Sequence, residues 1–93
     1  MTPEKKVEEA IKAWVRAPAQ GGWCVKIHAG AEQGKATLDL LGGLNGRPFL
    51  VEIKKPGEVG SPMQDALVER SKREGYISAV VDSLDEFKGL FNE

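Results

Sequence analysis

The 93-residue chain carries 13 Lys or Arg and 14 Asp or Glu residues, for a formal net charge of -1, and 41% of its residues are hydrophobic. A chain of this length has material for one core, so a single domain over residues 1–93 is expected. No apolar run approaches the roughly 20 residues that a membrane-spanning helix needs, and the charged start does not resemble a signal peptide. With Cys24 as its one cysteine, the chain can form neither an internal disulfide nor a CxxC metal site, which favours a reducing, cytoplasmic setting.

The net charge argues weakly against a nucleic-acid binder, because such proteins usually present a basic face. The distribution of charge reduces that objection. Residues 1–81 hold twelve basic and ten acidic residues, a surplus of two positive charges, and the last twelve residues hold four acids and one lysine.

A helix is predicted near the start of the chain, ending near residues 16–17. Thr2 is a suitable N-cap, and Pro3 suits the first helical position. On a helical projection, Glu8 lies at the border of the apolar stripe and Glu9 lies on the opposite side, so we expect Glu8 to face inward and Glu9 to face water. The apolar stripe consists of Val7, Ile11, Trp14 and Val15.

Three strands are predicted next. Residues 23–28 alternate between apolar and polar side chains, which is typical of a half-buried strand, and a Gly-containing loop over 29–35 follows. Two apolar runs, over residues 37–43 and 48–54, surround Asn45-Gly46. This dipeptide is the strongest short-range signal for a two-residue type I′ hairpin.

The last part of the chain predicts a helix, a strand and a short helix. Ser61-Pro62-Met63-Gln64 has the pattern of a capping box that opens a helix, and Gly75 closes it. Residues 76–81 indicate a buried strand, and Ser83-Leu84-Asp85-Glu86 is a second capping box before a final helix. The expected fold is therefore α/β, with an αβββαβ order followed by a short C-terminal helix.

The hairpin turn also fixes which residues face each other. With Asn45 and Gly46 as the loop, paired positions sum to 91, and Asp39 is expected directly opposite Glu52. Two like charges in such a pair destabilise a hairpin unless something compensates them, and a divalent cation would do so. On the other face the same register pairs apolar residues: Leu38 with Ile53, Leu40 with Val51 and Gly42 with Phe49.

Asp39, Glu52 and Lys54 therefore form a candidate metal-dependent active site. Magnesium accepts carboxylate oxygens and keeps several waters, so two carboxylates leave room for a phosphate and a water. Lys54 points to the same face as Glu52 and can orient that water or stabilise developing negative charge. Glu8, on the inner edge of the first helix, can bind the metal's water or a second ion. This chemistry suits phosphodiester hydrolysis; the alternative is a solvated strand face on which Asp39 is incidental.

At these residues the sequence resembles the PD-(D/E)xK nuclease superfamily, and more narrowly the VRR-NUC family, many of whose small stand-alone members come from phages. The resemblance rests on Glu8, on Asp39, on Glu52-Ile53-Lys54 and on Ser61-Pro62-Met63-Gln64. It implies a restriction-endonuclease-like αβββαβ core with a central mixed sheet flanked by helices. It also implies Mg²⁺ or Mn²⁺ at Asp39, Glu52 and Glu8, with catalytic support from Lys54, Glu8 and Gln64. One departure is Ala36-Thr37-Leu38 before the aspartate, where family members commonly have Gly-x-Pro.

The resemblance further implies a DNA endonuclease, phage-encoded and acting in the host cytoplasm. Small stand-alone proteins of this type resemble Holliday-junction resolvases, in which two subunits each cut one strand of a four-way junction. Symmetrical cleavage needs two sites related by a two-fold axis, so a homodimer is expected. The alternatives are a flap, nicking or end-processing nuclease, and a non-catalytic DNA-binding or assembly module that keeps the fold.

Other features are open to two interpretations. Gln64 has a sufficient role in its capping box, and Arg70 can bind phosphate or lie on a solvated helix face. Lys35 and Lys55 are further candidates for DNA contact, although Lys35 lies in a loop whose glycine spacing does not fit an NTPase phosphate-binding loop. No nucleotide cofactor is therefore expected. His28 suits a structural or solvated role, and the two tryptophans, Trp14 and Trp23, suit the core or a dimer interface.

Overall fold

A computed structural model of the chain describes residues 1–28 and 38–92. Its elements follow the predicted order, so the α/β fold with an αβββαβ core and a short C-terminal helix is confirmed. None of the helices in the described part is long and apolar enough to cross a membrane. The elements are α1 (Pro3–Arg16), β1 (Trp23–Lys26), β2 (Leu40–Leu44), β3 (Arg47–Ile53), α2 (Pro62–Arg73), β4 (Ile77–Val81) and α3 (Leu84–Gly89).

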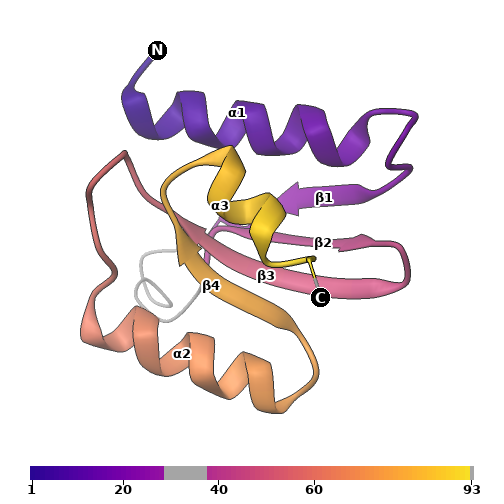
Figure 1. Cartoon of the computed structure of the whole chain (residues 1–93). Coiled ribbons are helices and arrows are strands. Elements are labelled where there is room, and N and C mark those ends of the chain that lie inside the picture. Colours follow the sequence, from indigo (N-terminus) through magenta and orange to yellow (C-terminus); the bar gives the residue numbers. More distant parts are fainter. Residues whose placement is uncertain (29–37, 93) are drawn as a thin grey trace.

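The four strands form one mixed sheet between two layers of helices. They lie in the order β1-β2-β3-β4, with antiparallel pairing from β1 to β3 and parallel pairing between β3 and β4. The parallel pair needs a crossover connection, which α2 supplies. In Figure 1, α1 and α3 lie on one side of the sheet and α2 lies on the other, packed on β3 and β4. The register places the ends of β1, β3 and β4 and the start of β2 at one end of the sheet.

The β2–β3 hairpin has the predicted turn and register. Asn45 and Gly46 have φ values of 54° and 75°, and a type I′ turn requires positive φ at both central positions. The ladder pairs Leu44 with Arg47, and the predicted pairs Gly42–Phe49 and Leu40–Val51 are confirmed.

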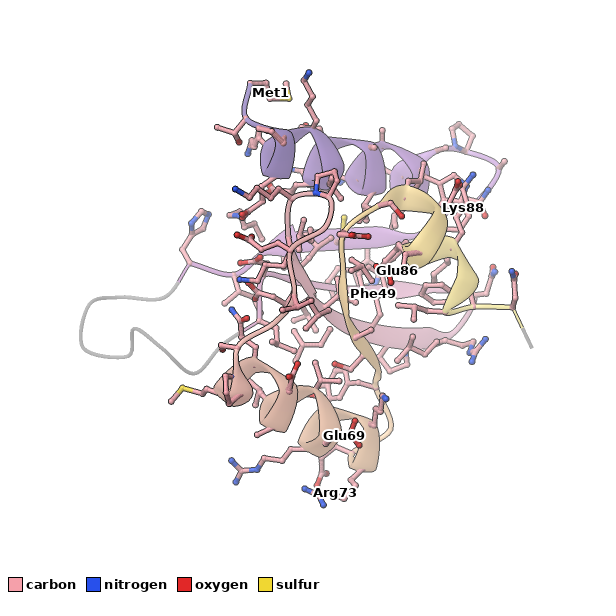
Figure 2. The ribbon with its side chains drawn as sticks, turned by 60° about the vertical axis from the view of Figure 1, so that its left-hand side comes forward. Met1, Phe49, Glu69, Arg73, Glu86 and Lys88 are labelled. Carbon is pink, nitrogen blue, oxygen red and sulfur yellow. The ribbon has the colours of Figure 1, made fainter. Side chains whose placement is uncertain are left out.

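The core lies between the sheet and the α1/α3 layer. Phe49 is fully buried, packs edge-on against Phe87 at 5.1 Å, and points into the interior in Figure 2. Its ring lies over Gly42, where a Cβ atom would meet Phe49 Cζ at 2.4 Å, so glycine is needed at this position. Trp14 is partly buried and packs edge-on against Phe87, which confirms the core interpretation of that tryptophan. Burial of each large side chain stabilises the fold by roughly 1.5 to 3 kcal/mol.

The helix starts agree with their capping signals, with one difference. Thr2 Oγ1 accepts from the Lys5 N–H, and Ser61 and Gln64 form the complete capping box at α2. At α3, Ser83 Oγ accepts from the Glu86 N–H, but Glu86 Oε1 accepts from the Asp82 N–H instead of closing the box on Ser83.

Strand β1 differs from its prediction in length and orientation. It ends at Lys26, whereas the alternation predicted a strand to residue 28. Cys24 faces the core, while Trp23 and Val25 are 55% and 49% exposed on the opposite face. The core interpretation of Trp23 is therefore wrong. Its indole lies across Gly43 on the sheet surface, 2.7 Å from the position a Cβ atom would take there.

Candidate active site

Asp39 is held at the end of the sheet by hydrogen bonds to β3 and to Ile27, the residue that follows β1. Its N–H donates to the Val51 carbonyl over 3.0 Å, and its carbonyl accepts from the Ile27 N–H over 2.7 Å. Its Oδ2 atom accepts from the Ile53 N–H over 3.0 Å. The regular β2–β3 ladder stops at Leu40–Val51, so Asp39 is not in a simple ladder pair with Glu52; its carboxylate turns toward the backbone of β3 beside that residue.

Glu52 is a buried carboxyl group next to Asp39. It is 6% exposed, and burial, followed by the negative charge of Asp39, raises its pKa to about 7. Lys54 is the nearest cation, with Nζ 3.7 Å from Glu52 Oε2. This one ammonium does not overcome the combined effect of burial and a like charge. The structure therefore brings Asp39, Glu52 and Lys54 together, but without the direct Asp39–Glu52 strand pair that the hairpin register predicted.

This pair of carboxylates fits a hard divalent cation. Its donor atoms are carboxylate oxygens, which suit Mg²⁺ and Mn²⁺, and a divalent charge would offset the repulsion that raises the Glu52 pKa. Across residues 1–28 and 38–92, no group of three or more Asp, Glu, His or Cys side chains converges on one point. The remaining ligands of such a cation would be water or substrate oxygens.

Glu8 faces inward, as the helical projection predicted, and lies among lysines. It is 3% exposed. Its Oε1 accepts from Lys26 over 2.9 Å, and its Oε2 accepts from Lys5 and Lys12 over 3.3 and 3.2 Å. Burial alone would raise the pKa of Glu8, but the hydrogen bonds from Lys26, Lys12 and Lys5 outweigh it and lower the pKa to about 2. Both oxygens are thus engaged, and Glu8 is linked to the Asp39 region through Lys26.

Lys26 is a residue of this region that the sequence reasoning missed. Its hydrogen bond to Glu8, with a further contribution from the negative charge of Asp39, raises its pKa despite partial burial. It lies at the end of β1, next to the Ile27 N–H that Asp39 accepts. A usable signal was present: a helix that turns Glu8 into the protein needs a cation opposite it, because unpaired charges are rarely buried.

The other candidates lie outside the carboxylate pair. Gln64 Oε1 accepts from the Ser61 N–H, so its amide oxygen serves the capping box. Lys55 is exposed and lines a cavity beside Lys26. Arg70 is exposed in the last turn of α2, and Figure 2 shows Arg73 on the outer side of the same helix. Lys35 lies outside the described residues.

Comparison with known proteins addresses the fold as a whole. No family model matches the sequence, and no curated protein matches it. A solved structure described as a VRR_NUC domain superposes with a TM-score of 0.79 and 29% sequence identity, over 97% of this chain and 95% of that one. The chain is thus similar to a VRR_NUC domain over nearly its whole length. This similarity supports the sequence resemblance to the VRR-NUC nucleases and agrees with the restriction-endonuclease-like fold.

Proposed function

We propose that residues 1–93 form a single metal-dependent endonuclease domain that hydrolyses DNA phosphodiester bonds, with Asp39, Glu52 and Lys54 at its centre. The observation that carries this proposal is the buried carboxyl group of Glu52 next to the partly buried Asp39. Glu52 is kept beside Asp39 although burial and like charge raise its pKa to about 7. Carboxyl groups with strongly shifted pKa values are common at functional sites. A buried carboxylate beside a like charge costs stability, which a function in catalysis would explain. One cysteine and a DNA substrate suit action inside a cell.

Asp39 and Glu52 are the residues that would hold Mg²⁺ or Mn²⁺. When bound, the metal would neutralise charge on the phosphate and acidify a water molecule. Asp39 is suited to fixed ligand geometry because three hydrogen bonds hold its backbone and carboxylate. Lys54 keeps a compact, mobile ammonium at 3.7 Å from Glu52, where it can orient a water molecule or stabilise negative charge that develops on the phosphate.

Glu8 and Gln64 support this centre from further away. Glu8 has both oxygens engaged by lysines, so its metal ligation would require Lys26 to move. We assign it the positioning of Lys26 next to Asp39. Gln64 fixes the first turn of α2 through its capping box, which sets where that helix starts beside the end of β3.

The preferred substrate in this proposal is a four-way DNA junction cut by a homodimer. Two nicks placed symmetrically require two active sites related by a two-fold axis. The surface that we propose for self-association is the face of β1 that carries Trp23 and Val25, both about half exposed. Exposed clusters of large apolar side chains on small proteins commonly mark interaction surfaces.

The test is cleavage of labelled four-way junction, flap and linear duplex DNA with Mg²⁺, Mn²⁺ or EDTA. Asp39→Asn and Lys54→Ala are compared with Lys72→Ala, which removes an exposed lysine that pairs with Glu69 on α2. We expect symmetrical, metal-dependent nicks in the junction, lost in Asp39→Asn and Lys54→Ala and kept in Lys72→Ala.

The other outcomes separate the alternatives. Preferential cleavage of flap or linear DNA keeps the nuclease and rejects the resolvase. Binding of DNA without turnover under any metal condition rejects the enzyme and favours a DNA-binding or assembly module. Cleavage that survives in both Asp39→Asn and Lys54→Ala rejects this site.

A further inference from the structure

A cavity of about 550 Å³ lies beside Lys26 and Lys55 and has no role in the proposed hydrolysis. We refer to it as the α1 cavity. The first turns of α1, the end of β1 and the segment after β3 form it. Its charged lining consists of three lysines and three glutamates: Lys5, Lys26, Lys55, Glu4, Glu8 and Glu58. Its volume lies within the range of sites that bind a small molecule or one unit of a polymer.

The lysines and glutamates of the α1 cavity are not equivalent. Glu8 is buried and is already neutralised by its lysine partners. Glu4 and Glu58 are exposed, so salt screens their charges strongly. The side chain of Lys26 is 31% exposed and keeps a fixed position through its 2.9 Å contact with Glu8. Lys26 is therefore the least exposed cation of the cavity lining, and its ammonium is held in place by Glu8.

Lys26 has capacity for a further partner. An ammonium group carries three N–H donors. Among the described residues, the hydrogen bond to Glu8 Oε1 is the one that its Nζ makes. The remaining donors are available to an oxygen-rich ligand, and the segment that follows Lys54 brings Lys55 to the same cavity.

The α1 cavity lies close to the proposed cleavage site. Ile27, the residue after Lys26, donates its N–H to the Asp39 carbonyl over 2.7 Å. A DNA strand carries one phosphate per nucleotide, so a strand with one phosphate at Asp39 and Glu52 would bring a neighbouring phosphate near this cavity.

We propose that the α1 cavity binds a DNA backbone phosphate next to the one that is cut, with Lys26 and Lys55 as its cationic contacts and Glu8 as the residue that positions Lys26. This inference rests on the proposed nuclease function. It makes Lys26 a substrate-binding residue that a buried glutamate holds in place.

The experiment compares Lys26→Met with Lys12→Met. Both lysines contact Glu8, but only Lys26 is among the residues that line the cavity. Binding of a fluorescein-labelled DNA duplex is measured by anisotropy in EDTA over a series of KCl concentrations. Each phosphate contact contributes a slope of about 0.9 to the plot of log affinity against log salt. We expect Lys26→Met to lower the magnitude of the slope by about 0.9 and Lys12→Met to leave it unchanged.

Two controls keep the outcome interpretable. Lys26→Arg retains the charge and should keep the wild-type slope, and it serves as the second variant if Lys26→Met does not give a wild-type circular dichroism spectrum. Equal slopes for Lys26→Met and Lys12→Met would overturn the cavity proposal and leave the proposed nuclease function intact. The same holds if Lys26→Arg lowers the slope as much as Lys26→Met does. A wild-type protein that neither binds nor cleaves DNA overturns the proposed function itself, and the cavity proposal with it.

Discussion

Two glutamates of this protein are buried to a similar extent, but their pKa values are shifted in opposite directions. Glu8 and Glu52 are 3% and 6% exposed. Three lysines lower the pKa of Glu8 to about 2 against the effect of burial, whereas burial and Asp39 raise the pKa of Glu52 to about 7. Since a pKa that differs between folded and unfolded states makes stability depend on pH, the two residues contribute to stability with opposite sign.

The first prediction concerns Glu52→Gln in metal-free solution. The folded-state pKa of about 7 lies above the ordinary value of 4.5, so the folded protein binds this proton more tightly than the unfolded chain. The contribution of Glu52 is therefore most favourable below about pH 4.5 and is lost as the pH rises through 7. We expect Glu52→Gln to raise the free energy of unfolding by about 1 to 3 kcal/mol near pH 8, and to change it little near pH 4.

Thermal unfolding with EDTA at both pH values measures this effect, since 1 kcal/mol shifts the melting temperature of a domain this size by about 4 to 8 °C. Glu69→Gln is the control, because that side chain is 67% exposed. A Glu52→Gln variant that is less stable than the wild type near pH 8 would contradict the prediction that the ionised Glu52 side chain destabilises the folded protein.

The second prediction concerns Glu8→Gln and has the opposite sign. The folded-state pKa of about 2 lies below 4.5, so the stabilising contribution is complete above about pH 4.5 and is lost as the pH falls toward 2. The lysine partners are partly exposed, so we discount the full shift and expect a loss of about 1 to 2 kcal/mol near pH 7. Urea titrations from about pH 7 down to pH 3 should show the difference from wild type shrinking with acid. Glu9→Gln shares the partners Lys5 and Lys12 but not Lys26, and should show a smaller change.

At the residue scale, the sequence predicted what periodicity and register determine. The inward direction of Glu8 follows from its angle to the apolar stripe of α1, and the proximity of Asp39 to Glu52 follows from the turn at Asn45-Gly46. Lys26 was not predicted, because a lysine at a polar strand position is usually solvated. Its direction depends on how α1 packs on β1, which no local pattern contains.

The start of α2 allows an element-scale prediction about Gln64. Its amide oxygen accepts from the Ser61 N–H over 2.9 Å, which closes the capping box. A glutamate at this position makes the same bond, whereas alanine removes it. We expect Gln64→Ala to lower the free energy of unfolding by about 0.5 to 1 kcal/mol and Gln64→Glu to leave it close to wild type. Chemical denaturation measures both; equal destabilisation by the two substitutions would show that the cap does not determine the stability of this helix end.

Elements with explicit start and stop signals were predicted more accurately than those without. Helices α1 and α2 begin where Thr2 and Ser61 cap them, and the hairpin turn falls at its Asn-Gly pair. Strand β1 has no such signal at its end, and it was predicted two residues too long. Its apolar alternation also suggested a core role for Trp23, but Cys24 is the residue that packs toward α1, because an alternating pattern does not say which face of a sheet is covered.

At the scale of the whole molecule, the two faces of the sheet differ in how they are covered. Helices α1 and α3 cover one face, and α2 packs on β3 and β4 on the other (Figure 1). Trp23 and Val25, on the α2 side of β1, stay about half exposed. A cavity of about 320 Å³ lies beside Trp23 and includes Gly43 and Pro48 in its lining. Trp23 and this cavity lie toward the hairpin turn, away from the end of the sheet that carries Asp39, so two subunits joined at Trp23 would leave both candidate sites accessible.

The prediction at this scale is that Trp23→Lys separates the proposed homodimer into monomers. A buried interface tryptophan typically contributes 2 kcal/mol or more, so its loss should raise the dimer dissociation constant by a factor of about 30 or more. Sedimentation velocity over a range of protein concentrations measures this change. Met63→Lys is the matched control, because Met63 is 51% exposed, close to the 55% of Trp23, but lies at the start of α2.

The two substitutions together decide between surfaces. Each replaces a half-exposed apolar side chain by lysine and adds one positive charge, so a general effect of charge on solubility or association would appear in both. Dissociation in Trp23→Lys alone assigns the dimer contact to β1. Dissociation in Met63→Lys alone moves it to the start of α2, next to the segment after Lys54, where a partner subunit would contact the region around the active site. A wild-type protein that stays monomeric at all concentrations would reject the homodimer, and symmetrical cutting of a junction would then require two independent binding events.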